Sequence, residues 1–242
     1  MTKTYRIADR VIEITSLYPE VHTYCKEYVW DGESDFGVTT TLEDIAFERA
    51  QSAREDEIEH RQVRHYSDGY LEELAVYRKI AERMLDYKTF LFHGSVIAVD
   101  NKAYLFTARS GTGKSTHTRL WRELLGERAV MVNDDKPLIR VGRDGVFVYG
   151  TPYNGKHRIG SNICVPLKAV AVLERSETNQ IERIELTEAY PILLQQVYRP
   201  SDAQKMLITM QLINEFAERT ALYRLGCNME IQAARIAYSG MR

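Results

Sequence analysis

The feature that most constrains the fold is a glycine-rich segment between an apolar stretch and an amphipathic one. Residues 108–116 read ARSGTGKST and follow the apolar sequence AYLFT (103–107). The glycines at positions 111 and 113 can adopt backbone conformations that are closed to other residues, so that successive N–H groups converge on one anion. The next residues, 116–125 (THTRLWRELL), read as a helix, whose N-terminus adds unpaired N–H groups and a positive dipole end. The sequence therefore predicts a strand, a phosphate-binding loop and a helix, in that order.

The side chains of this segment suit a bound nucleotide. Lys114 supplies a positive charge for the β- and γ-phosphates, and the hydroxyl of Ser115 can coordinate Mg²⁺. The pattern departs from G-x-x-x-x-G-K-[ST] at its first position, which is Ala108. A glycine turn that only caps a helix is the alternative, but it leaves the Lys-Ser pair unexplained. We expect nucleotide contacts from seven consecutive residues: Ser110, Gly111, Thr112, Gly113, Lys114, Ser115 and Thr116.

Two further candidates stand on either side of this segment. The apolar sequence AVMVN (129–133) predicts a strand that ends in Asp134 and Asp135. Such a pair usually belongs to a turn. Here, however, the pair follows the phosphate-binding loop by a single helix. In that place the first or second carboxylate can hold Mg²⁺ while the other accepts a proton from a hydroxyl. His93, followed by Gly94, precedes the strand before the loop. A lone histidine is more often a core or loop residue. His93 is a candidate because it accompanies the predicted phosphate-binding loop and the aspartate pair.

The composition excludes several classes of protein. Among 242 residues there are 32 Lys and Arg and 34 Asp and Glu, so no basic excess exists to neutralise a nucleic-acid backbone. No apolar run approaches the roughly 18 residues of a bilayer span, and the first ten residues lack the apolar segment of a signal peptide. The three cysteines at 25, 164 and 227 form neither a disulfide framework nor a zinc spacing. We expect a cytoplasmic protein with no nucleic-acid or membrane partner.

The pattern along the chain predicts an accessory region at residues 1–66 and an α/β body at 67–242. In the first region, residues 5–14 alternate like a strand, and a helix is expected after a cap at Thr39–Thr41. Mixed charges over 43–66 are typical of a solvated helix face or a mobile segment. Residues 70–87 form an amphipathic pattern that predicts a helix packed on the body.

Within the body, short apolar runs rich in β-branched and aromatic residues predict a sheet. The last third, 187–241, has mainly helical spacing with one strand-like interruption at TALYRLGC (220–227). The fold class is therefore mixed α/β. The other expected strands are at 89–99, 103–108, 129–133, 137–142, 145–150 and 167–175.

The order of these motifs carries a resemblance. His93-Gly94, SGTGKS (110–115) and Asn133-Asp134-Asp135, in that order, resemble the catalytic domain of HPr kinase/phosphorylase and are similar to the phosphate site of phosphoenolpyruvate carboxykinases. The match covers roughly 90–175. It implies a carboxykinase-like mixed β-sheet core with a P-loop, a helical C-terminal part and a small N-terminal accessory region.

The resemblance also implies a reaction and roles. The reaction would be Mg²⁺-dependent phosphoryl transfer from ATP, or a related donor, to a serine-like hydroxyl of a protein, peptide or small molecule. Asp134 would be the general base, while Asp135 and Ser115 would lie at the metal. Lys114 would bind the transferring phosphate and His93 would orient or polarise the reacting groups. Similar kinases are often homo-oligomers.

The sequence departs from this family after the aspartates. HPr kinases carry a Glu-x-Arg-Gly-Leu-Gly loop that supplies a second metal ligand, whereas residues 150–158 read GTPYNGKHR and contain no carboxylate. Metal coordination and acceptor recognition must differ, and phosphorylase activity does not carry over. Lys156, His157 and Arg158 can contact an anionic donor or acceptor, or form a solvated basic loop. Arg199 is a weaker candidate for a transition-state cation.

Two other functions stay open at this point. The chain could bind a nucleotide as a regulatory protein without turnover, although a site for binding alone would not need both a metal ligand and a base. It could also be an accessory protein of a peptide-modification pathway. In that case residues 43–66 would contact the partner.

Overall fold

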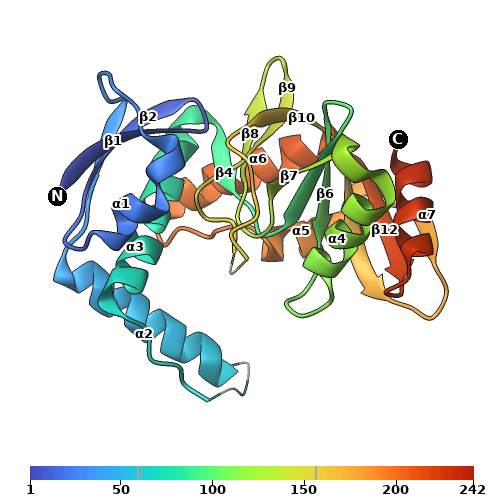
Figure 1. The fold of residues 1–242 in the computed structure, drawn as a ribbon, viewed down its shortest axis with the longest axis horizontal. Coiled ribbons are helices and arrows are strands. Elements are labelled where there is room, and N and C mark those ends of the chain that lie inside the picture. Colours follow the sequence, from blue (N-terminus) through green and yellow to red (C-terminus); the bar gives the residue numbers. More distant parts are fainter. Residues whose placement is uncertain (59, 61, 156) are drawn as a thin grey trace. The chain divides into compact units, whose positions relative to one another are not determined.

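The structure is a computed structural model that describes residues 1–58, 60, 62–155 and 157–242. Its contacts divide the chain into two compact units, Met1–Arg83 and Met84–Arg242, both drawn in Figure 1. The expected boundary was between 66 and 67, so the position differs by the length of helix α3 (Asp68–Met84). Among the described residues, no helix is long and apolar enough to cross a membrane.

The first unit begins with a three-stranded sheet. Strands β1 (Thr2–Ile7) and β2 (Arg10–Thr15) are antiparallel, and β3 (Phe36–Thr39) runs parallel to β2. The single strand expected over 5–14 was therefore wrong, because the chain reverses at Ala8 and Asp9, with φ of 49° and 60°. Two successive positive φ values define the tight turn whose twist suits a hairpin. The short helices α1 (Glu20–Tyr24) and η1 (Lys26–Tyr28) lie between β2 and β3.

Helix α2 (Leu42–Ile58) starts where the capping residues predicted it. The Asp44 N–H donates to Thr41 Oγ1 over 3.4 Å, and the Thr41 N–H donates to Asp44 Oδ2 over 3.0 Å. This reciprocal pair satisfies N–H groups that the first helical turn leaves open. The exposed, mixed-charge surface of α2 agrees with the solvated helix face expected from the sequence.

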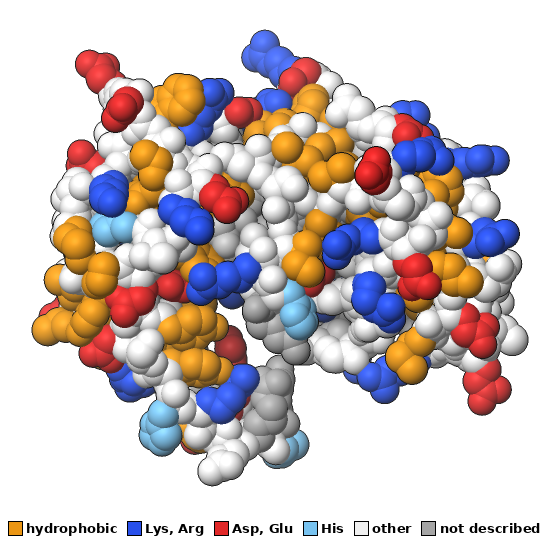
Figure 2. Space-filling model, viewed as in Figure 1, with side chains coloured by type: hydrophobic (Ala, Val, Ile, Leu, Met, Phe, Trp, Pro, Cys, Tyr) orange, Lys and Arg blue, Asp and Glu red, His pale blue; other side chains and the backbone are white. Residues whose placement is uncertain are grey.

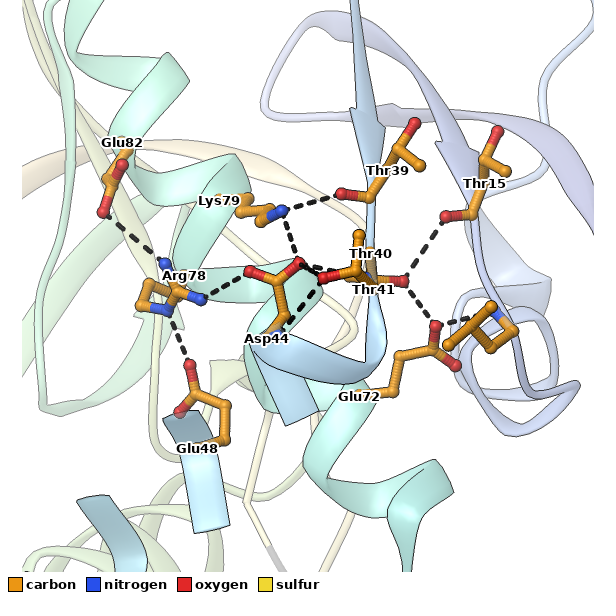
Figure 3. Close-up of polar contacts among 11 residues, drawn as sticks. Thr15, Thr39, Thr40, Thr41, Asp44, Glu48, Glu72, Arg78, Lys79 and Glu82 are labelled. Atoms are coloured by element: carbon orange, nitrogen blue, oxygen red, sulfur yellow. Dashed lines mark hydrogen bonds and ion pairs between the residues drawn. The ribbon is translucent and has the colours of Figure 1, made fainter. Parts of the chain in front are cut away.

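Helix α3 is joined to the rest of the first unit by buried and partly buried polar contacts, which Figure 3 shows. Arg78 donates to Glu48 over 2.6 Å and to Asp44 over 3.1 Å, and Lys79 donates to Asp44 over 2.6 Å. Glu72 is fully buried and accepts hydrogen bonds from the N–H groups of residues 17 and 18, and from the Thr40 hydroxyl. These contacts explain why the unit boundary follows α3.

The second unit is built on a large, curled, mixed sheet. The strand order is β4-β8-β9-β10-β6-β5-β7, with β12 beside β10 and β11 beside β12. Among the described strand pairs of this sheet, only β10–β6 and β10–β12 are parallel. The strands are β4 (Thr89–Leu91), β5 (Ser95–Val99), β6 (Lys102–Thr107), β7 (Ala129–Asn133), β8 (Leu138–Gly142), β9 (Gly145–Tyr149), β10 (Cys164–Arg175), β11 (Gln180–Arg183) and β12 (Ala221–Cys227).

Helices cover both faces of this sheet. Alternate residues of β6 belong to different apolar clusters: Phe106 packs in the cluster that includes Trp121 of α4, and Leu105 packs in the cluster that includes Phe216 of α6. Successive side chains of a strand point to opposite faces of the sheet, so the two clusters lie on opposite faces of this sheet. The helices are α4 (Lys114–Leu125), α5 (Leu186–Gln195), α6 (Ala203–Glu218) and α7 (Ile231–Met241), with short turns η2 (Leu85–Tyr87) and η3 (Gly126–Arg128). The mixed α/β class is confirmed.

The strand expected over 89–99 is divided in two, which corrects the sequence interpretation. At the break, the His93 N–H donates to the Gln196 carbonyl over 2.6 Å, and the Gly94 N–H donates to the Asp135 carbonyl over 2.9 Å. β4 pairs with β8, whereas β5 pairs with β6 and β7. On the face drawn in Figure 2, side chains of both charges are interspersed, in keeping with the balanced composition.

Candidate functional site

The glycine-rich loop lies between the end of β6 and the start of α4. Gly111 has φ of +76° and Gly113, the residue before the helix, has φ of +122°. A Cβ on Gly111 would meet nothing within 4 Å, so the requirement for glycine there is conformational rather than spatial. The Arg175 side chain, from the end of β10, donates to the Gly111 carbonyl over 2.7 Å. A side chain of β10, the parallel neighbour of β6, thus holds the loop in place.

Lys114 is the first residue of α4, and its side chain folds back into this loop. Its Nζ donates to the Ala108 carbonyl over 3.1 Å, and the residue is 9% exposed. Burial lowers the pKa of Lys114, although the carboxylates of Asp135 and Asp134 act in the opposite direction. A buried ammonium that lacks a full counter-charge favours an anion placed beside it. Of the other expected nucleotide contacts, Ser110, Gly111 and Ser115 are exposed, and Thr112, Gly113 and Thr116 are half-buried.

A fully buried amide shapes the turn after β7. Asn133 Oδ1 accepts from the N–H of Asp135 over 2.9 Å and from that of Lys136 over 2.8 Å, and its Nδ2 donates to Thr151 Oγ1 over 3.0 Å. Asparagine commonly accepts backbone hydrogen bonds from residues just ahead of it in such turns. Asn133 therefore orients the two aspartates, a role that the sequence interpretation did not assign to it.

The first aspartate of the pair faces α4. Asp134 is 9% exposed and its Oδ1 accepts from the Ser95 hydroxyl over 2.6 Å. The Ser95 oxygen lies 3.1 Å from the hydroxyl oxygen of Thr118, on the second turn of α4. Among the described residues, Oδ2 of Asp134 has no hydrogen-bond donor. Ser95 and Thr118 were missed from the sequence, because their proximity depends on the pairing of β5 with β7.

The second aspartate faces His93. The His93 Nε2 lies 3.4 Å from Asp135 Oδ1, and its Nδ1 lies 3.1 Å from Gln196 Oε1. Burial alone would raise the pKa of Asp135, but His93, Lys136 and Lys114 together hold it below its usual value. Asp135 is therefore held in its ionised form, and His93 contacts this aspartate rather than Asp134. The contact of Gln196 with His93 was also missed from the sequence.

The loop after β9 passes close to the aspartates. A Cβ on Gly155, whose φ is +76°, would lie 3.1 Å from the Asp135 Cβ, and the Ser161 N–H donates to the Val132 carbonyl over 3.2 Å. His157 and Arg158 of this loop are exposed. Lys156, the third member of the expected anion-contact group, lies outside the described residues. Arg199 is exposed on the connection between α5 and α6.

Two pockets adjoin the start of α4. One has a volume of about 240 Å³, and Ser115, Asp134 and His157 are among its lining residues. The other has a volume of about 650 Å³, and Gly111, Gly113 and Arg175 are among the residues that line it. Ala108, Arg109 and Thr112 also line a third pocket, of about 380 Å³, so the glycine-rich loop and the start of α4 border three spaces.

A magnesium ion would find oxygen ligands here, but no protein cage. Over the described part of the chain, no group of three or more His, Cys, Asp and Glu side chains is arranged to hold a metal. Mg²⁺ usually takes one or two carboxylates and completes its shell with phosphate oxygens and water. The Ser115 hydroxyl and the ionised Asp135 carboxylate are oxygen groups of the kind that Mg²⁺ takes. The cysteines at 25, 164 and 227 form no disulfide.

Comparisons with known proteins add one likeness. No family model and no curated protein matches the sequence. Among solved structures, the HPr(Ser) kinase/phosphatase from Coxiella burnetii is similar, with 12% identity, 51% of this chain and 93% of that chain covered, and a TM-score of 0.31. A likeness of this size assigns no role to any residue.

Proposed function

We propose that the second unit is a Mg²⁺-dependent phosphotransferase. It would move a phosphoryl group from ATP, or a related donor, to a serine-like hydroxyl of a protein, peptide or small molecule. The observation that carries this proposal is that Ser115, next to Lys114 at the start of α4, lines the same pocket of about 240 Å³ as Asp134. In this proposal residues 108–116 are the P-loop of a carboxykinase-like core.

On the donor side, the loop and the helix N-terminus bind the phosphates. The backbone N–H groups from Gly111 to Ser115 offer donors that a phosphate can take, and the helix dipole favours negative charge there. Lys114 neutralises the transferring phosphate, which in return compensates for the buried ammonium. Catalysis in this class rests mainly on positioning and on stabilising charge.

The metal would be held by the Ser115 hydroxyl and the Asp135 carboxylate. When bound, Mg²⁺ neutralises the charge that develops on the transferring phosphoryl group. His93 acts through Asp135, because it contacts one carboxylate oxygen and leaves the other for the metal. His93 is therefore a positioning residue in this proposal, and its orientation is supported by Gln196.

On the acceptor side, Asp134 takes the proton. The Ser95 hydroxyl donates to Oδ1, which leaves Oδ2 for the acceptor hydroxyl. As the proton moves to Asp134, the acceptor oxygen bonds to the γ-phosphorus and the bond from phosphorus to the bridging oxygen of the donor breaks. ATP would leave as ADP. The two aspartates thus have different tasks, one for the proton and one for the metal.

Thermal stabilisation by ligands tests the proposal first. ATP, GTP, pyrophosphate and phosphoenolpyruvate are each added with and without Mg²⁺, because a ligand that binds the native state raises its stability by mass action. A Mg²⁺-dependent shift identifies the donor and supports the proposal. No shift with any of the four would overturn it.

Two substitutions separate binding from transfer. Lys114→Ala should weaken donor binding, whereas Asp134→Asn should keep binding and lose phosphoryl transfer. Asp144→Asn, at the exposed turn between β8 and β9, is the matched control and should change neither. If Asp134→Asn keeps full turnover, the base assignment is wrong. A donor that binds without any turnover would favour the regulatory alternative.

A further inference from the structure

One face of helix α4 leads from the proposed metal ligand to two arginines. Ser115, Thr118, Arg119 and Arg122 are spaced at i, i+3, i+4 and i+7, so they lie on the same face. All four line the pocket of about 240 Å³ that Asp134 also lines. The opposite face of α4, which includes Trp121, is buried in the apolar core. The pocket is therefore lined both by two guanidinium groups and by the proposed base.

The charges around this pocket are predominantly positive. Asp134 is the only carboxylate among the described residues that line it, and His157 lines it as well. Arg119 lies 3.6 Å from Glu123, but both side chains are about 60% exposed (62% and 59%). A pair so exposed to water is worth little, so Arg119 can turn to a new anion. Arg122 is exposed and forms no ion pair within the described part of the chain.

We propose that the phosphoryl acceptor is a small hydroxyl compound that carries an anionic group, a carboxylate or a phosphate. Its hydroxyl would face Asp134 while its anionic group binds Arg119 and Arg122. This inference rests on the proposed function and names its acceptor class. Guanidinium groups bind both anions through paired, charge-assisted hydrogen bonds. The volume of about 240 Å³ lies below the range of roughly 300–1,000 Å³ typical of drug-sized ligands.

The transfer step is balanced without any further reactant. The acceptor hydroxyl gives its proton to Asp134, and its oxygen forms the new bond to the γ-phosphorus. With ATP as the donor, the bond from that phosphorus to the bridging oxygen breaks and ADP leaves. The anionic group of the acceptor takes no part in bond making, so it serves only for recognition.

The test compares acceptors with counterparts that lack the anion. The full chain, with Mg²⁺ and the donor identified by thermal shift, is given L-serine or L-serinamide, D-glycerate or glycerol, and glycerol 3-phosphate or glycerol. Phosphorylated product is followed by ³¹P NMR. At least one anionic acceptor should be phosphorylated about ten times faster than its counterpart, since one charged hydrogen bond is worth about that factor or more. The two glycerol pairs distinguish carboxylate from phosphate.

Substitution of the arginines completes the test. Arg122→Gln and Arg119→Gln should each lower kcat/KM for the anionic acceptor by roughly tenfold to a hundredfold, without changing the thermal shift caused by the donor. Arg235→Gln, at an exposed arginine of α7, is the matched control and should change neither value.

Three results would overturn the inference while the donor still binds. They are equal transfer to the uncharged counterparts, unchanged transfer by both arginine variants, and no transfer to any acceptor tested. If the donor itself does not bind, the proposed function fails instead.

Discussion

His117 is a buried imidazole whose surroundings predict a pH-dependent stability for the second unit. It lies on the first turn of α4, is 2% exposed, and its Nε2 accepts from Trp121 Nε1 over 3.0 Å. Its Nδ1 is buried and has no hydrogen-bond partner among the described residues. The ring packs edge-on against Phe106, with centroids 4.7 Å apart. Nothing in this environment compensates for a positive charge, and burial lowers the pKa of His117 from its usual 6.5 to about 4.

The sign and size of the effect follow from these two pKa values. Between pH 6.5 and pH 4 the unfolded chain binds a proton at this histidine and the folded chain does not, so stability falls as the pH falls. Integrated over this window, the loss attributable to His117 is about 2 kcal/mol between pH 7 and pH 5, and about 3 kcal/mol by pH 4. Substitution by glutamine removes the titrating group while keeping an acceptor for Trp121.

Urea unfolding followed by the fluorescence of Trp121 gives the measurement. The chain has two tryptophans, and Trp30 belongs to the first unit, so Trp30→Phe serves as the background in which Trp121 alone reports on the second unit. The free energy of unfolding of His117→Gln should depend less on pH than that of the parent, by about 2 kcal/mol between pH 7 and pH 5. His157→Gln, at an exposed histidine, is the control. Parallel curves for parent and His117→Gln would refute the reasoning.

Three further substitutions have expected outcomes. Lys114→Met removes a buried ammonium, so the second unit should melt at a higher temperature while the ATP-induced thermal shift disappears; a lower melting temperature would contradict this. Gly150→Ala places a Cβ 1.8 Å from the Ser161 carbonyl oxygen, and urea unfolding should show a loss of about 2 kcal/mol or more. Glu72→Ala leaves the buried Thr40 hydroxyl and the partly buried N–H groups of residues 17 and 18 without an acceptor, so Trp30 fluorescence should report a loss of about 3 kcal/mol in the first unit, with the Trp121 transition unchanged.

The parts of the fold that the sequence predicted are those with local signals. The order of β6, the glycine-rich loop and α4 followed from the change of apolar spacing around residues 108–116, and β7, the β8–β9 hairpin, β10 and β12 followed from apolar runs. The break between β4 and β5 could not be predicted, because its hydrogen bonds go to Gln196 and Asp135, far along the chain. The turn at Ala8 and Asp9 lacks the glycine that usually marks such a reversal. β11 is mostly exposed and has no apolar run.

The residues of the candidate site likewise divide into those with a local sequence signal and those without one. The glycines and Lys114 were predicted because they lie in one short segment with a known spacing, and the aspartates because they are adjacent at the end of an apolar run. Ser95, the partner of Asp134, is brought close only by the pairing of β5 with β7, and Gln196, the partner of His93, comes from the end of α5. The arginines of α4 did have a local signal, because they repeat the helical spacing from Ser115. That signal has meaning only once Asp134 is known to line the same pocket.

The two adjacent aspartates differ because the turn between them separates their surroundings. Asn133 binds the N–H groups of the two residues after Asp134, so the chain bends at the end of β7 and consecutive carboxylates face different elements. Asp134 is directed to Ser95 and the polar face of α4, while Asp135 is directed to His93. Equivalent carboxylates in one environment would compete for the same cation and proton. The different environments lower the pKa of Asp135 and place Asp134 beside the pocket, which in the proposed function suits the first to the metal and the second to the acceptor hydroxyl.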